Sequence, residues 1–199
     1  ALEADGVLAQ AKELLMIHNL ARMKELEEKS QRDGLTGAYN RMYFDETLRH
    51  EFNLATQYHL PLTIAIIDLD HFKRVNDTHG HLAGDSLLVT VVKNVCAQIR
   101  QDDTLSRYGG EEFALILPGT TLEASRNLIA RLKEAITEIA YELDDSCIIQ
   151  ITASIGVAAY HEGSTTFNEP LDMIKAADSA LYAAKHAGRN RIVEWNSLL

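Results

Sequence analysis

Apolar residues along the chain follow two spacings, which predict that helices and strands alternate over most of its length. Apolar side chains that recur every three or four positions indicate amphipathic helices at 41–57, at 83–100, from 118–121 to about 139, and at 171–184. Short β-branched or alternating runs indicate strands at 62–68, 104–108, 113–117, 148–159 and 191–195. Gly109 and Gly110 lie between two of these strands and predict a hairpin. The pattern therefore predicts an α/β (α+β) fold, in which helices wrap a central mixed β-sheet.

The first thirty residues differ in character from the rest. Residues 8–28 contain no proline, and their apolar positions lie among Lys, Arg and Glu without a sustained heptad register. Two interpretations stay open, a surface helix packed on its own domain and a connecting helix that pairs with a second copy. We therefore expect an N-terminal connecting or dimerisation helix at 1–30 and a separate folded domain at 31–199. The chain begins at Ala1 rather than Met, which is consistent with a piece of a longer protein.

Composition and charge narrow the possible functions. The chain has 199 residues, 46% of them hydrophobic, which is enough for one core. Nineteen Lys and Arg against twenty-nine Asp and Glu give a net charge of −10, which repels nucleic acid and anionic lipid. Cys96 and Cys147 are too few for a disulfide framework, and we expect both in the core. No apolar stretch reaches the roughly 20 residues of a membrane span, so a cytoplasmic setting is expected, although a longer parent protein could carry a membrane anchor.

Two pairs of carboxylates mark the candidate chemistry. Asp68 and Asp70 end a buried strand two positions apart, so both side chains lie on the same side of the sheet. Glu111 and Glu112 follow the glycine pair, and only one of them can face Asp68 because neighbours in extended chain point to opposite faces. Carboxylates that converge from two strands suit Mg²⁺, although acids in turns are more often simply solvated.

The segment after the first pair adds cations and polar groups. Lys73 and Arg74 lie directly beyond the strand, and a metal site with a nearby lysine is typical of triphosphate binding. Asn76 and Asp85 flank a turn-rich stretch, and a carboxylate can accept both N–H groups on the guanine edge. Asp85 could equally cap the helix predicted at 83–100.

Four motifs in order resemble the GGDEF domains, the diguanylate cyclases. They are DGLTGAYNR at 33–41, DLDHFK through NDTHGH to GD at 68–85, RYGGEEF at 107–113, and ALYAAK with GRNR at 180–191. The resemblance covers about residues 31–195. It implies a fold similar to nucleotidyl cyclases and polymerase palms, and an enzyme that condenses two GTP into cyclic di-GMP and two pyrophosphates.

The resemblance also implies roles for individual residues. Asp68 and Glu111, with the Leu69 carbonyl, would hold two Mg²⁺ ions per site, or Mn²⁺ as an alternative. Glu111 would also assist deprotonation of the attacking hydroxyl, and Glu112 and Asp70 would support the site. The catalytic set is Asp68, Lys73 and Glu111, and the substrate-binding set is His71, Phe72, Asn76, Asp85, Gly109, Gly110, Lys185 and Arg189.

Partners and regulation follow from the same resemblance. Each domain would hold one GTP, so catalysis needs a homodimer, with an upstream sensor domain outside this chain. Arg100 and Asp103 resemble the RxxD site at which cyclic di-GMP inhibits its own synthesis, and Arg131 is expected to add a cation from the partner domain. Two rival functions remain, a catalytically silent domain that acts as a cyclic di-GMP receptor and a nonenzymatic dimerisation module.

Overall fold

The computed structural model describes residues 2–139, 141–144, 147–160 and 167–195. The described chain forms two compact units that meet between Arg32 and Asp33. The first unit consists mainly of one helix, α1 (Leu2–Ser30). Its large apolar side chains at positions 14–17 are all more than half exposed. The apolar residues of α1 therefore contribute little to a core of their own.

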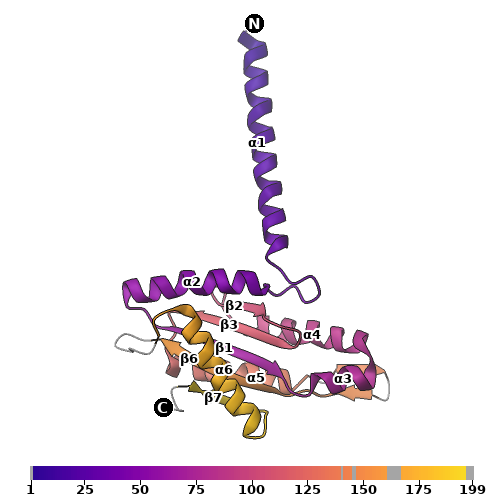
Figure 1. The fold of residues 1–199 in the computed structure, drawn as a ribbon. Coiled ribbons are helices and arrows are strands. Elements are labelled where there is room, and N and C mark those ends of the chain that lie inside the picture. The colour runs from indigo at the N-terminus through magenta and orange to yellow at the C-terminus, as the bar shows by residue number, and fades with distance from the viewer. Residues whose placement is uncertain (1, 140, 145–146, 161–166, 196–199) are drawn as a thin grey trace. The chain divides into compact units, whose positions relative to one another are not determined.

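The second unit is built around a five-stranded mixed sheet with the strand order β2-β3-β1-β6-β7 (Figure 1). Its strands are β1 (Leu62–Leu69), β2 (Thr104–Arg107), β3 (Glu112–Pro118), β6 (Ala153–Tyr160) and β7 (Ile192–Glu194). All neighbouring strands are antiparallel except β6 and β7, which are parallel. The mixed sheet confirms the predicted fold class.

Helices cover both faces of this sheet. They are α2 (Arg41–Tyr58), α3 (Phe72–His79), α4 (His81–Cys96), α5 (Leu122–Thr137) and α6 (Pro170–His186). Residues of α3, α4 and α5 share one core cluster with Ala65, Ile67 and Leu69, whereas residues of α2 and α6 share the other with Leu62, Ile64 and Ile66. Alternate residues of β1 thus enter opposite cores, because successive side chains of a strand point to opposite faces of the sheet.

Local signals place several helix ends. The Asn40 side chain accepts a hydrogen bond of 3.0 Å from the Tyr43 N–H and caps α2, as predicted. Thr121 caps α5 in the same way by accepting from Ala124 at 3.1 Å. The caps satisfy N–H groups that the first turn of a helix leaves without partners.

Three sequence predictions need correction. The helix expected at 83–100 begins earlier, at His81, and a separate helix, α3, occupies the segment before it. The strand expected at 148–159 is two strands, β5 (Cys147–Ile149), which pairs with β4 (Tyr141–Asp144), and β6. Cys96 is exposed rather than in the core, because it is the last residue of α4 and lies past the buried stripe that ends at Val95. The side chain of Cys147 lies outside the part that the structure describes.

None of the described helices is both long enough and apolar enough to cross a membrane.

Candidate active site

The candidate site lies at the edge of the sheet that is formed by strand ends, where β1 finishes and β3 begins. Asp68 is opposite Glu112 in the antiparallel register, and the Leu69 N–H donates to the Glu111 carbonyl at 3.2 Å. Asp68 is only 7% exposed, and its even position in β1 places it on the same face as Ile64 and Ile66, toward α6. The predicted convergence of acids from two strands is therefore present.

Lys185 of α6 pairs with Asp68. Its Nζ lies 2.7 Å from Asp68 Oδ2, and both side chains are mostly shielded from solvent. A lysine at this distance compensates a carboxylate that the fold has taken largely out of water. The end of α6 is thus anchored at the edge of the sheet.

Glu111 experiences an environment that disfavours its charge. Burial, followed by the negative charge of Asp68, raises the pKa of the Glu111 carboxyl, while Lys185 acts in the opposite direction. Glu111 precedes the first residue of β3, so strand alternation does not dictate its direction. Two acids that repel one another beside a single lysine form a place where a cation would be stabilised.

The hairpin that carries Glu111 is held by its own backbone. The N–H groups of Tyr108 and Gly109 both donate to the Glu112 carbonyl, at 2.8 and 3.1 Å. A Cβ atom on Gly109 would lie only 2.7 Å from Glu112 Oε2, so a side chain there would displace that carboxylate. Glu112 therefore packs back across the turn, which fits a supporting role better than a ligand role.

Arg107 ties this hairpin to the start of the domain. Its guanidinium donates to the Gly110 carbonyl at 2.8 and 3.1 Å and to both carboxylate oxygens of Asp33 at 3.2 and 3.3 Å. Burial alone would raise the pKa of Asp33, but hydrogen bonds from Thr36 and the charge of Arg107 together lower it. The sequence analysis did not identify this contact, because the two partners are 74 positions apart.

Asp70 connects the end of β1 by hydrogen bonds to the start of β6 and to the turn after α6. Its carboxylate accepts hydrogen bonds from Thr152 Oγ1 at 2.6 Å, Ser154 Oγ at 2.7 Å and the Asn190 N–H at 3.0 Å. Both oxygens therefore have protein donors. Asp70 supports the strand end and the turn that carries Arg189.

The helices α3 and α4 place the predicted substrate-binding residues. β1 ends two residues before His71, which takes a left-handed conformation (φ 58°) and leads into α3. Phe72 is buried and Lys73 is exposed in the first turn. The sequence analysis missed α3, because a helix of only eight residues with a single buried apolar side chain is too short for the apolar spacing to recur.

Asn76 lies in the junction between these two helices. Its side chain occupies the space that a Cβ atom on Gly84 would need, and its Oδ1 is buried without a hydrogen-bond partner in the described structure. Asp85 is the next residue after Gly84. The alternative role of Asp85 as a helix cap is wrong, because α4 begins at His81 and Asp85 lies inside it.

The residues of the predicted inhibitory site lie elsewhere. Asp103 Oδ2 accepts from the Arg100 N–H at 2.8 Å, and the Asp103 N–H donates to the Arg100 carbonyl at 3.2 Å. Burial raises the pKa of Asp103, against the opposing effect of Arg100. This turn precedes β2 at the end opposite the glycine hairpin. Arg131 donates to the Gln98 carbonyl at 3.1 Å, which places it beside this turn in its own chain.

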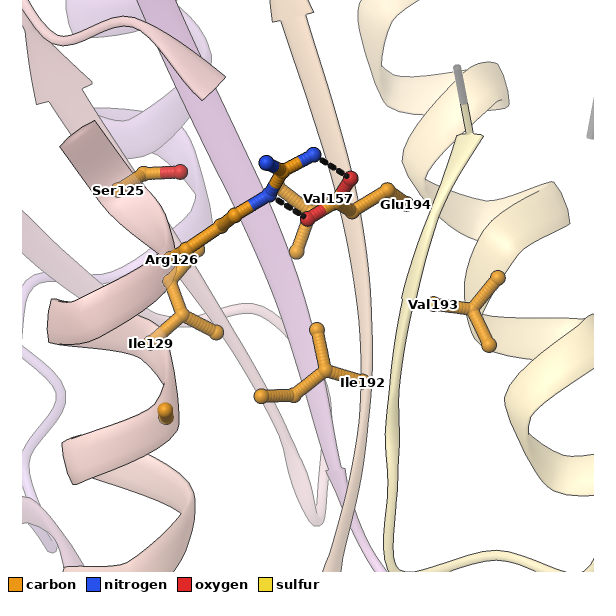
Figure 2. Close-up of a pocket in the computed structure, with 8 residues that line it drawn as sticks. Ser125, Arg126, Ile129, Val157, Ile192, Val193 and Glu194 are labelled. Atoms are coloured by element: carbon orange, nitrogen blue, oxygen red, sulfur yellow. Dashed lines mark hydrogen bonds and ion pairs between the residues drawn. The ribbon is translucent and has the colours of Figure 1, made fainter. Parts of the chain in front are cut away.

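A cavity of about 400 Å³ lies between α5 and the strands β6 and β7 (Figure 2). Ile129, Val157 and Ile192 line it, and Arg126 bridges to both carboxylate oxygens of Glu194 at 2.7 and 2.8 Å. None of its lining residues is a predicted site residue. The predicted chemistry is therefore concentrated at the edge of the sheet and not in this cavity.

The donor set at the edge fits a hard cation. Asp68 and Glu111 are close enough for the charge of one to raise the pKa of the other, and carboxylate and carbonyl oxygens are the ligands that Mg²⁺ prefers. Among the residues whose positions the structure describes, no three His, Cys, Asp or Glu side chains form a metal-binding cluster. A cation here would therefore take further oxygens from a ligand such as a phosphate or from water.

Sequence comparison matches residues 30–191 to the family described as "Diguanylate cyclase, GGDEF domain". The chain is 38% identical over 168 residues to the probable diguanylate cyclase DgcC of Escherichia coli. The matched region covers 84% of this chain and 44% of that protein. It is 39% identical over 173 residues to the diguanylate cyclase DgcP of Pseudomonas aeruginosa, and this match covers 86% of this chain and 25% of that protein. The chain thus spans less than half the length of these relatives.

Solved structures with the same fold include a GGDEF domain and a diguanylate cyclase. The coiled coil and GGDEF domain of DgcB from Caulobacter crescentus, in complex with c-di-GMP, has a TM-score of 0.82 at 28% identity, covering 92% of this chain and 96% of that one. The diguanylate cyclase SiaD of Pseudomonas aeruginosa, in complex with its activator SiaC, has a TM-score of 0.78 at 32% identity. The match covers 96% of this chain and 77% of that one.

Proposed function

Because the chain belongs to the GGDEF family of diguanylate cyclases, we propose that it condenses two GTP into cyclic di-GMP and two pyrophosphates. The observation that carries the proposal is the meeting of Asp68, Glu111 and Lys185 at one edge of the sheet. Two acids and a lysine at the end of a glycine hairpin suit a metal-bound triphosphate.

Asp68 and Glu111, with the Leu69 carbonyl, would hold two Mg²⁺ or Mn²⁺ ions. Bound there, the ions would polarise the α-phosphate and favour the ionised form of the attacking 3′-hydroxyl. The raised pKa of Glu111 supports this role, because a cation would relieve its repulsion with Asp68. Lys185, displaced from Asp68, would then be available to the β- and γ-phosphates together with Lys73 and Arg189.

Asn76 and Asp85 would recognise guanine. The buried Oδ1 of Asn76 has no hydrogen-bond partner in the described structure, and a guanine N–H would supply the missing donor. Asp85 does not cap α4, so its carboxylate is available to accept the remaining N–H groups. His71 and Phe72 start α3 between this pair and the carboxylates. Gly109 and Gly110 let a nucleotide approach the hairpin backbone.

The reaction would require two copies of the domain, each with one GTP. The exposed apolar side chains of α1 support a helix that pairs with its copy and brings the two sites together. A sensor domain upstream of α1 would then control the encounter.

Product inhibition would act at the Arg100 turn. Arg100 is exposed next to the partly buried Asp103, and Arg131 from α5 lies beside the same turn. Two guanidinium groups and a carboxylate suit the phosphates and guanine edges of cyclic di-GMP.

The test is incubation of the purified chain with GTP and Mg²⁺, followed by chromatography for cyclic di-GMP. We expect product from the wild type and from Glu46→Gln, an exposed acid on α2, and none from Glu111→Gln or Asp68→Asn. A wild type that binds cyclic di-GMP but forms none would support the receptor function instead. Near-normal turnover of Glu111→Gln would contradict the assignment of the metal ligands.

A further inference from the structure

The last turns of α6 carry an exposed aromatic pair beside the candidate site. The ring of Tyr182 lies against that of His186 with centroids 4.1 Å apart and planes tilted by 41°, and the tyrosine is 64% exposed. Tyr182 lies three residues before Lys185, so both occupy the same side of the helix. Lys185 in turn contacts Asp68.

The packing of α6 prevents this pair from turning inward. The buried side of α6 is rich in alanine, and it rests directly on β6 at Gly156. A Cβ atom on Gly156 would overlap the Ala177 carbonyl oxygen and the Leu181 nitrogen. Backbone contact this close fixes the rotation of the helix, so the exposure of Tyr182 is imposed by the fold.

The pair lies on the other side of the sheet from the residues that would bind guanine. Phe72 of α3 belongs to the core cluster on one face, whereas Leu181 of α6 belongs to the cluster on the opposite face. The Asn76 junction lies between α3 and α4 on the first face. A nucleotide whose base is held there can reach Lys185 with its phosphates, but its base cannot also reach Tyr182.

We propose that Tyr182 and His186 form a platform for the nucleoside part of the GTP that the facing domain carries. The inference rests on the proposed function, in which two domains each bring one GTP. An aromatic ring offers a stacking face to a base or ribose. The platform would orient the second substrate without contributing to the binding of the first.

The experiment compares two measurements on Tyr182→Ala. The first is the affinity of the dilute chain for a non-hydrolysable GTP analogue with Mg²⁺, and the second is kcat for cyclic di-GMP at saturating GTP and high protein concentration. Loss of one base-stacking contact predicts a fall in kcat of about tenfold to a hundredfold, with the affinity unchanged. Tyr182→Phe keeps the ring and should retain most of kcat. Tyr58→Ala removes a tyrosine of similar exposure (58%) at the end of α2 and should change neither quantity.

Each other outcome has a defined meaning. An unchanged kcat for Tyr182→Ala would overturn the platform while the wild-type activity upholds the proposed function. An equal loss of analogue affinity in the dilute chain would assign the ring to its own nucleotide and would also overturn it. A wild type that forms no cyclic di-GMP would overturn the proposed function, and the platform with it.

Discussion

At the scale of single residues, Arg107 joins segments that are far apart in the chain. One guanidinium bonds the Gly110 carbonyl in the hairpin and the Asp33 carboxylate at the start of the domain. Both ion-pair partners are mostly shielded, with 18% and 22% of their side chains exposed. The contact therefore couples the position of the glycine hairpin to the turn that precedes α2.

Arg107→Lys is expected to lower the free energy of unfolding and kcat together. Lysine keeps the charge but lacks the planar fork that reaches both partners at once. Loss of hydrogen bonds between charged and partly buried groups predicts a cost of about 1–3 kcal/mol in urea unfolding. Arg126→Lys is the matched control, because its pair with Glu194 is exposed, and it should have a clearly smaller effect on both quantities. Equal effects of the two variants would show that Arg107 does not stabilise the position of the glycine hairpin.

Glu111→Gln is expected to stabilise the metal-free chain at neutral pH. The pKa of Glu111 is raised above its usual value of 4.5, so the folded state binds this proton more tightly than the unfolded state. The contribution of this group to stability is therefore present at low pH and is lost as pH rises through the raised pKa.

Thermal unfolding of the wild type and of Glu111→Gln from pH 4 to 7 in a chelator tests this. The difference in Tm should favour the variant increasingly as pH rises above about 4.5. A constant difference across this range would show that Glu111 does not repel its neighbours.

At the scale of elements, the contact of α6 with β6 positions the candidate site. Asp70 links β1 to the turn after α6 through the Asn190 N–H, and Lys185 links α6 to β1 through Asp68. The helix lies so close to β6 that only glycine fits at position 156. The placement of Lys185 thus depends on the packing of the α6 backbone against Gly156 in β6, the strand next to β1.

Gly156→Ala is expected to destabilise the domain by about 1–3 kcal/mol or more, because overpacking forces backbone to move. Movement of α6 should also separate Lys185 from Asp68 and reduce turnover beyond the loss of folded protein. Urea unfolding and activity per folded molecule measure the two effects. Gly34→Ala is the control, since a Cβ atom there meets nothing within 4 Å. Wild-type stability of Gly156→Ala would mean that the helix is free to shift.

At the scale of the whole molecule, activity would depend on how two domains meet. α1 is a unit separate from the domain that carries the carboxylates, and its exposed apolar residues carry no part of the site. Its removal should therefore change encounter rather than chemistry.

Deletion of residues 1–28 should lower specific activity in dilute solution and leave it nearly unchanged at high protein concentration. Mass action compensates for a lost association element if the catalytic residues are intact. A dilution series of both proteins, with mass measured at each concentration, provides the test. Equal activity at every dilution would make α1 an ordinary surface helix.

Arg100→Ala should relieve inhibition by added cyclic di-GMP and preserve the initial rate. Arg100 precedes β2 at the end away from the glycine hairpin, so its loss should not disturb Asp68 or Glu111. Progress curves with and without added product measure the effect. Curves of variant and wild type that flatten at the same product concentration would exclude this role.

The sequence by itself determined the features that depend on neighbouring residues. The apolar run before Asp68 predicted β1, the glycine pair predicted the β2–β3 hairpin, and Asn40 predicted the start of α2. Each signal lies within a few positions, because strand period, turn conformation and helix capping are local properties.

Only the tertiary structure decided which distant side chains meet. It paired Lys185 with Asp68, Arg107 with Asp33, and Asp70 with Asn190 across 120 positions. It also removed Asp85 from a capping role by extending α4 to His81. These contacts depend on strand order and on the angle at which helices cross the sheet, which no local window of sequence encodes.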